Sequence, residues 1–121
     1  LARIVAHAVH AQEPNWFATA PVGAVQKLLA KANWSVKDVD LWEVNEAFAV
    51  VPMALMRELG LSHDIVNVNG GACALGHPIG ASGARIMVTL IHALKARDLK
   101  RGVATLCIGG GEATAVAIEL L

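Results

Sequence analysis

Three polar side chains of types used in catalysis stand where predicted strands give way to a turn or a helix: Asn45, His77 and Cys107. Ligands bind at the carboxyl ends of strands in parallel α/β sheets, so we expect these three side chains to converge there. A thiol acts as a nucleophile or base in its thiolate form, which a nearby imidazole favours. A carboxamide can orient a water toward a developing oxyanion. The pattern therefore predicts a site for nucleophilic or acid–base chemistry.

Each of these residues also has a purely structural interpretation. Asn45 is typical of a helix N-cap, Cys107 of a small buried apolar side chain, and His77 of a loop residue with satisfied hydrogen bonds. A metal site built from Cys73, His77 and Cys107 is a third interpretation. Its spacing matches no zinc pattern and a fourth ligand is not evident, so we expect no metal. We expect Cys73 to pack between small neighbours.

Glycines concentrate in the second half of the chain, beside two of these polar residues. Of the 11 glycines, nine lie at or after Gly70. Glycine is costly in chain entropy, so such clusters indicate positive φ angles or a close approach of backbone to a ligand. Phosphate-binding motifs do not account for them. Gly71 and Gly76 have the spacing of a P-loop but no lysine follows, and no G-x-G-x-x-G is present.

The periodicity of the apolar residues predicts an α/β domain with the element order β-α-β-α-β-α-β-β. We expect strands over residues 1–10, 39–44, 65–68, 102–108 and 114–120, and helices over residues 21–32, 46–59 and 80–97. The first strand should be buried on both faces, Thr19 should cap the first helix, Pro52 should kink the second and Gly60 should end it. The order indicates a mixed, mostly parallel sheet with helices on both faces and an antiparallel edge formed by the last hairpin.

Composition bounds the class of protein. The 121 residues fit one domain (1–121), and 55% are apolar against 17% charged, which excludes disorder and suggests a surface partly covered by neighbours. Ten basic residues balance ten acidic ones, so no net charge attracts nucleic acid or an anionic membrane. No apolar run is long enough for a membrane span. Two cysteines indicate free thiols in a reducing, cytoplasmic compartment.

Three blocks of the sequence resemble the signatures of a known family. Residues 45–48 (NEAF), 76–80 (GHPIG) and 107–111 (CIGGG) are similar in type, order and separation to signature blocks in the C-terminal half of thiolases. The resemblance spans essentially the whole chain and is closest to the bacterial-type acetyl-CoA acetyltransferases, the biosynthetic thiolases. It implies a thiolase-like α/β half. Because the chain opens at Leu1, directly in a strand-like run, we expect it to be part of a longer polypeptide.

The resemblance implies a Claisen condensation of two acetyl-CoA molecules to acetoacetyl-CoA, and the reverse thiolysis. His77 matches the histidine that activates a nucleophilic cysteine of the N-terminal half and then helps to hold a thioester oxygen. Asn45 matches the asparagine that positions a water in the same oxyanion hole. Cys107 matches the acid/base cysteine that removes the acetyl α-proton, and the Gly109 N–H matches a donor of the second oxyanion hole. Such donors and a soft base suit thioester carbanion chemistry.

Further expectations about binding and assembly come from the same resemblance. Phe48, Phe17 and Ala47 fall where thiolases line the channel for the pantetheine arm of CoA. We expect acetyl-CoA and acetoacetyl-CoA as substrates, no separate cofactor, the protein's own N-terminal thiolase domain as partner, and a homodimer or homotetramer. The isolated chain is then expected to be inactive. The alternative, from another functional class, is a non-catalytic thiolase-like module that binds acyl-CoA or acts as a scaffold.

Overall fold

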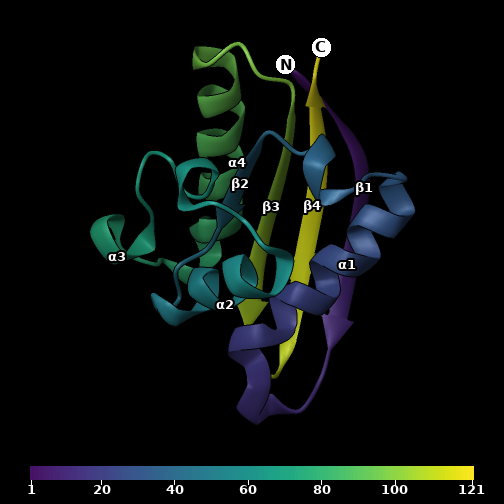
Figure 1. Cartoon of the computed structure of the whole chain (residues 1–121). Helices are drawn as coiled ribbons and strands as arrows, with labels where there is room; N and C mark the ends of the chain where they lie inside the picture. Colours follow the sequence, from purple (N-terminus) through teal and green to yellow (C-terminus); the bar gives the residue numbers. More distant parts are fainter.

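A computed structural model describes residues 1–121 and shows a four-stranded sheet with helices on both faces (Figure 1). The strands are β1 (Ala2–Ala11), β2 (Leu41–Val44), β3 (Arg101–Ile108) and β4 (Glu112–Leu120), and the helices are α1 (Ala20–Ala32), α2 (Val50–Leu59), α3 (Ala72–Leu75) and α4 (Ile79–Ala96). Short 3-10 turns cover Pro14–Thr19, Val36–Asp38 and His63–Ile65. The α/β class predicted from the sequence is confirmed, although the short helix α3 was not expected.

The sheet is mixed, but it is not mostly parallel. Its strand order is β1-β4-β3-β2, in which only β2 and β3 run parallel, while β4 is antiparallel to both β3 and β1. The C-terminal hairpin therefore lies inside the sheet and β1 forms an edge. As a consequence Ile4 and Val9 are about two-thirds exposed, at 66% and 67%. The expectation that this first strand is buried on both faces is wrong, because periodicity does not say which strand lacks a second neighbour.

Two apolar cores fill the two faces of the sheet. On one face α1 and α2 pack against side chains that include Trp42 and Val103. On the other face α4 contributes Ile86, Leu90 and Leu94, which share one side of the helix and are all fully buried. Side chains of β3 alternate between the two cores, as a strand covered on both faces requires.

The helix boundaries explain why one predicted distortion is absent. α2 begins at Val50 rather than near residue 46, so Pro52 lies in its first turn, where the missing N–H removes no hydrogen bond. The predicted kink at Pro52 is therefore wrong. Gly60 ends α2 in the left-handed conformation with φ of +67°, as predicted. Thr19 does precede α1, but its hydroxyl donates to Trp16 O at 2.9 Å and does not cap the helix.

No regular strand forms over residues 65–68, where the sequence predicts one. The side chain of Asn67 makes the hydrogen bonds that a strand would make there. Only isolated bridges occur there, and one of them joins Val66 to Trp42. Asn67 adopts a φ of +49°, and its carboxamide pairs with both backbone groups of Val44. Asn67 Oδ1 accepts from Val44 N and Asn67 Nδ2 donates to Val44 O, each at 2.8 Å. The amide thus satisfies the open edge of β2 where a further strand would otherwise pair.

The three-glycine turn between β3 and β4 is held in place by a backbone hydrogen bond from the loop that follows β1. Gln12 N donates to Gly111 O at 3.0 Å, and Gly111 has a φ of +95°. A Cβ at Gly111 would collide with the backbone oxygen of Gln12 and lie 3.0 Å from the Cα of Pro14. Both the positive φ and the close approach that the glycine clusters predict therefore occur at this position.

Replacing Gly111 with alanine should lower the free energy of unfolding by about 2–3 kcal/mol, because it adds left-handed strain and a backbone collision. Gly60→Ala is the matched control, since Gly60 also has a positive φ but nothing lies within 4 Å of the position that its Cβ would take. Urea unfolding should show a smaller loss for Gly60→Ala, about 1 kcal/mol, from the left-handed conformation alone. Equal losses for the two variants would show that the contact with residues 12–14 does not constrain the turn.

Candidate active site

The parallel pairing of β2 with β3 brings two of the predicted site residues to one edge of the sheet. β2 ends at Val44, and the next residue, Asn45, donates its N–H to Thr105 O at 2.9 Å. Thr105 is two residues before Cys107 on β3. The carboxyl ends of both strands lie at the lower edge of the sheet in Figure 1, away from the chain termini. Asn45 and Cys107 therefore occupy neighbouring strand ends.

His77 does not follow a strand, which corrects the prediction from the sequence; it reaches this edge from the loop that connects α3 to α4. Its Nε2 lies 3.4 Å from Asn45 Nδ2, and its Nδ1 lies 2.6 Å from the hydroxyl oxygen of Ser82. The His77 residue is exposed, whereas Asn45 is fully buried. The other amide atom, Asn45 Oδ1, is buried without a hydrogen-bond partner in the chain. A buried unpaired acceptor is costly, and this oxygen is therefore available to accept a hydrogen bond from a water or ligand that enters the site.

Cys107 differs from His77 in its surroundings. It is only 8% exposed, and its side chain belongs to the core beneath α1 and α2. Burial raises the pKa of the Cys107 thiol above its usual value, an effect larger than the opposing backbone hydrogen bond, so the thiol is neutral at pH 7. The sulfur is hydrogen-bonded to neither His77 nor Asn45. The structure thus joins Asn45 and His77 directly and places Cys107 at the same edge, on the adjacent strand.

Gly109 follows β3 in the turn that carries the second glycine cluster. The hydrogen bond of this turn runs from Gly111 N to Ile108 O at 3.1 Å, which leaves the Gly109 N–H without an acceptor in the chain. Gly109 is exposed, and nothing lies within 4 Å of the position that a Cβ would take. Two residues beyond Cys107, the chain therefore presents a free backbone donor of the kind used in oxyanion holes.

Two of the three residues predicted to line a substrate channel form an aromatic pair. The rings of Phe17 and Phe48 are 6.1 Å apart and inclined by 64°, an edge-to-face arrangement. Phe48 is 61% exposed, and Phe17 and Ala47 are partly buried against the core under α1 and α2. The loops before α1 and α2, far apart in sequence, meet here and offer apolar surface three residues from Asn45.

Glu46, for which the sequence predicts no role, holds the loop that carries His77. Glu46 Oε2 accepts from Cys73 N at 2.9 Å, and Glu46 Oε1 accepts from Asn67 Nδ2 at 3.2 Å. A Cβ on Gly71 would lie 2.6 Å from the Glu46 carboxylate, so Gly71 makes room for this contact. Cys73 itself is an exposed free thiol, which corrects the expectation that it packs between small neighbours.

An ion pair lies between the sheet and α4, close to the same loop. Arg85 Nη1 is 3.5 Å from Glu43 Oε2, and both carboxylate oxygens of Glu43 are buried without a hydrogen bond. Burial raises the pKa of Glu43 to about 7, although the positive charge of Arg85 opposes this shift. The guanidinium group of Arg85 is therefore paired with Glu43 inside the domain. No group of three or more His, Cys, Asp or Glu side chains is placed to hold a metal ion.

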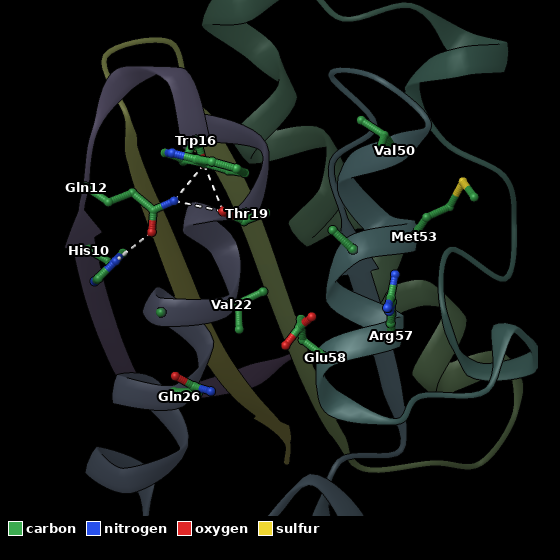
Figure 2. Close-up of a pocket in the computed structure, with 12 residues that line it drawn as sticks. His10, Gln12, Trp16, Thr19, Val22, Gln26, Val50, Met53, Arg57 and Glu58 are labelled. Carbon is green, nitrogen blue, oxygen red and sulfur yellow. Dashed lines mark hydrogen bonds between the residues drawn. The ribbon is translucent and has the colours of Figure 1, made fainter.

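The largest groove of the domain lies elsewhere, between α1 and α2, and has a volume of about 870 Å³ (Figure 2). Side chains from both helices face each other across it, and at one end Gln12 Nε2 donates to Thr19 Oγ1 at 2.8 Å. Asn45, His77 and Cys107 do not line this groove. None of the helices is both long and apolar enough to cross a bilayer.

Comparison with known proteins identifies the family to which this chain belongs. Residues 1–120 match the family model described as thiolase, C-terminal domain. The chain therefore belongs to the thiolase family and corresponds to its C-terminal domain, as the signature blocks indicate. The resemblance noted from the sequence is thus confirmed.

Individual relatives agree with this assignment. The chain is 54% identical over 119 residues to the acetyl-CoA acetyltransferase of Chromobacterium violaceum and 52% identical over 119 residues to the cytosolic acetyl-CoA acetyltransferase of Mus musculus. In both cases the match covers 98% of this chain and 30% of the relative. The chain thus spans less than a third of the length of these relatives.

Solved structures give the same result for the fold. The chain superposes on the crystal structure of the Bacillus anthracis acetyl-CoA acetyltransferase with a TM-score of 0.97 at 50% identity, covering 100% of this chain and 31% of that one. It superposes on human mitochondrial 3-ketoacyl-CoA thiolase with a TM-score of 0.96 at 48% identity, covering 99% and 30%. The predicted thiolase-like half is therefore confirmed as a fold.

The hydrogen bonds of Glu46 lead to a pH-dependent prediction. Burial alone would raise the pKa of this carboxyl, but the hydrogen bonds from Cys73 and Asn67 outweigh burial and hold the pKa below its usual value. A carboxyl with a lowered folded-state pKa stabilises the fold above its unfolded-state pKa, and the stabilisation disappears as the pH falls through the folded-state value. Glu46→Gln should therefore cost about 1 kcal/mol of unfolding free energy at pH 7, and less in acid.

Denaturant unfolding at pH 7 and at pH 3 measures both parts of this prediction. Glu58→Gln is the matched control, because Glu58 is an exposed carboxylate on α2 that makes no hydrogen bond or ion pair. It should change stability little at either pH. If Glu46→Gln lowers the free energy of unfolding equally at both pH values, the negative charge of Glu46 does not contribute to its hydrogen bonds with Cys73 and Asn67.

Proposed function

We propose that this chain is the C-terminal catalytic part of an acetyl-CoA acetyltransferase, which condenses two acetyl-CoA molecules to acetoacetyl-CoA and catalyses the reverse thiolysis. The observation that carries the proposal is the contact of Asn45 with His77 at the strand end beside Cys107, with a buried amide oxygen left unpaired. Membership of the thiolase family and the names of the relatives in Chromobacterium violaceum and Mus musculus support the choice of reaction.

The first half-reaction needs a nucleophile from outside these 121 residues. His77 takes the proton of a cysteine in the N-terminal domain, and that cysteine attacks the carbonyl carbon of acetyl-CoA. The C–S bond to CoA then breaks and an acetyl thioester forms on the enzyme. Cys107 gives its proton to the leaving CoA sulfur. Its raised pKa suits this step, because a neutral thiol is needed as the donor.

The second half-reaction uses the thiolate that this transfer leaves on Cys107. The thiolate takes an α-proton from a second acetyl-CoA, and the enolate oxygen is held by His77 Nε2 and by a water that Asn45 positions. The enolate carbon attacks the acetyl-enzyme, a C–C bond forms, and the C–S bond to the N-terminal cysteine breaks. The Gly109 N–H stabilises the tetrahedral oxyanion of this step. The released cysteine recovers its proton from His77, and acetoacetyl-CoA leaves.

Binding and assembly form the rest of the proposal. Phe17, Phe48 and Ala47 contact the apolar pantetheine arm, and basic residues for the CoA phosphates come from the rest of the protein, since Arg85 is paired with Glu43. The N-terminal thiolase domain is the partner that completes the site. The full protein acts in the cytoplasm as a homodimer or homotetramer, without a separate cofactor.

Activity of the native protein that carries this chain tests the proposal. It should cleave acetoacetyl-CoA with CoA, and it should prefer this substrate to longer 3-ketoacyl-CoA thioesters. His77→Ala and Cys107→Ala should each lower kcat/KM for thiolysis by about 100- to 10,000-fold, because each removes a proton-transfer group. Cys73→Ala is the matched control, since it removes an exposed thiol at no strand end, and should retain activity.

Other outcomes of the same assay would contradict the proposal. The 121-residue chain alone should show no thiolysis, and robust turnover by this chain would refute a site shared with an N-terminal domain. A native protein that binds CoA thioesters in calorimetry but turns over none of them would be the non-catalytic acyl-CoA-binding module instead. If the protein cleaves longer 3-ketoacyl-CoA thioesters faster than acetoacetyl-CoA, it is a thiolase for longer acyl chains and not an acetyl-CoA acetyltransferase.

A further inference from the structure

A serine that lies outside the three signature side chains makes the shortest contact to the His77 ring. Ser82 lies in the first turn of α4 and is 1% exposed. Its Oγ is 2.6 Å from His77 Nδ1 and 3.1 Å from the carbonyl oxygen of Pro78. The hydroxyl therefore connects the imidazole to the backbone at the start of the helix that follows it.

The protons of this group can be assigned from its partners. The geometry assigns the single hydrogen of the Ser82 hydroxyl to Pro78 O, and the Asn45 amide donor that faces the other ring nitrogen agrees with this assignment. Toward His77, Ser82 Oγ must then act as an acceptor, and the proton of the neutral imidazole lies on Nδ1. In that tautomer Nε2 carries a lone pair, and it faces the Nδ2 donor of Asn45 at 3.4 Å.

We propose that Ser82 is a positioning residue that selects the Nδ1–H tautomer of His77 and so keeps Nε2 as the proton acceptor of the site. This proposal rests on the proposed function for its kinetic consequence, but the tautomer itself is a property of the chain. A hydrogen bond to one ring nitrogen fixes both the tautomer and the orientation of the ring, and thereby which nitrogen is available for chemistry.

The same surroundings show that removing the hydroxyl leaves the backbone intact. The carbonyl of Pro78 also accepts from Ala81 N at 2.8 Å and from Ser82 N at 3.0 Å. Ser82→Ala therefore leaves no buried carbonyl unpaired there, and it deletes the bond to His77 without removing a helical hydrogen bond. Threonine keeps a hydroxyl that can bond the carbonyl four residues earlier in a helix, so Ser82→Thr is the conservative variant.

The kinetic test uses the native protein that carries this chain. Ser82→Ala should lower kcat for acetoacetyl-CoA thiolysis about 10- to 100-fold, the usual effect of losing a group that orients a histidine, with a much smaller change in KM. Ser82→Thr should restore most of the activity. Ser62→Ala is the control for loss of a hydroxyl, because Ser62 is exposed and its hydroxyl bonds only to Asp64. Full kcat in Ser82→Ala would overturn the proposal.

Nitrogen-15 NMR of the labelled histidine rings gives a readout that a merely structural role would not move. The parent protein should show His77 protonated on Nδ1 at a pH where the ring is neutral, and Ser82→Ala should show a mixture with the Nε2–H form. An unchanged tautomer in Ser82→Ala would overturn the proposal. This measurement does not need turnover, so it separates failure of the proposed function, in which the parent cleaves no acetoacetyl-CoA, from failure of the Ser82 assignment.

Discussion

The parallel ladder between β2 and β3 is the constraint on which the candidate site depends. It sets the ends of two strands side by side, so that Asn45 is bonded to Thr105 and stands next to the strand end that carries Cys107. Parallel strands need a long crossover connection, and here that connection includes α2, α3 and α4. The loop with His77 is part of it. One pairing therefore determines where all three segments of the site meet.

Side chains rather than backbone ladders hold this loop in place. The Asn67 amide pairs with Val44, Glu46 binds the Cys73 N–H, and Ser82 binds the His77 ring. Such polar contacts specify one geometry for residues that no strand or long helix contains. The glycines of the loop fit this picture, since Gly71 leaves the space that the Glu46 carboxylate fills.

The sequence predicts the features of the fold that depend on neighbouring residues, but not those that depend on partners distant in the chain. The boundaries of α1, the stop at Gly60 and the C-terminal hairpin depend on neighbouring residues and were predictable. The edge position of β1 and the missing strand at residues 65–68 depend on partners distant in the chain. Asn67 looks like a loop residue in sequence, yet its side chain takes the place of a strand.

The candidate site shows the same division. Motifs and predicted strand ends pointed to Asn45, His77 and Cys107, because a carboxamide, an imidazole and a thiol that meet at one edge of a sheet can carry catalysis. Ser82 and Glu46 were missed because a serine in a Gly-Ala-Ser-Gly run and an acid before a helix have commoner local roles. The only available signal was their position: Ser82 five residues after His77, and Glu46 directly after Asn45. Their bonds depend on the tertiary path of the loop, which no local pattern encodes.

A crystal structure of the native protein with bound acetyl-CoA would show whether Asn45, His77 and Cys107 act on one substrate. We expect the thioester oxygen about 3 Å from His77 Nε2, with the acetyl methyl group against the Cys107 sulfur and the pantetheine arm along Phe17 and Phe48. A thioester bound in the groove between α1 and α2, or a Cys107 sulfur turned away from the acetyl group, would contradict it.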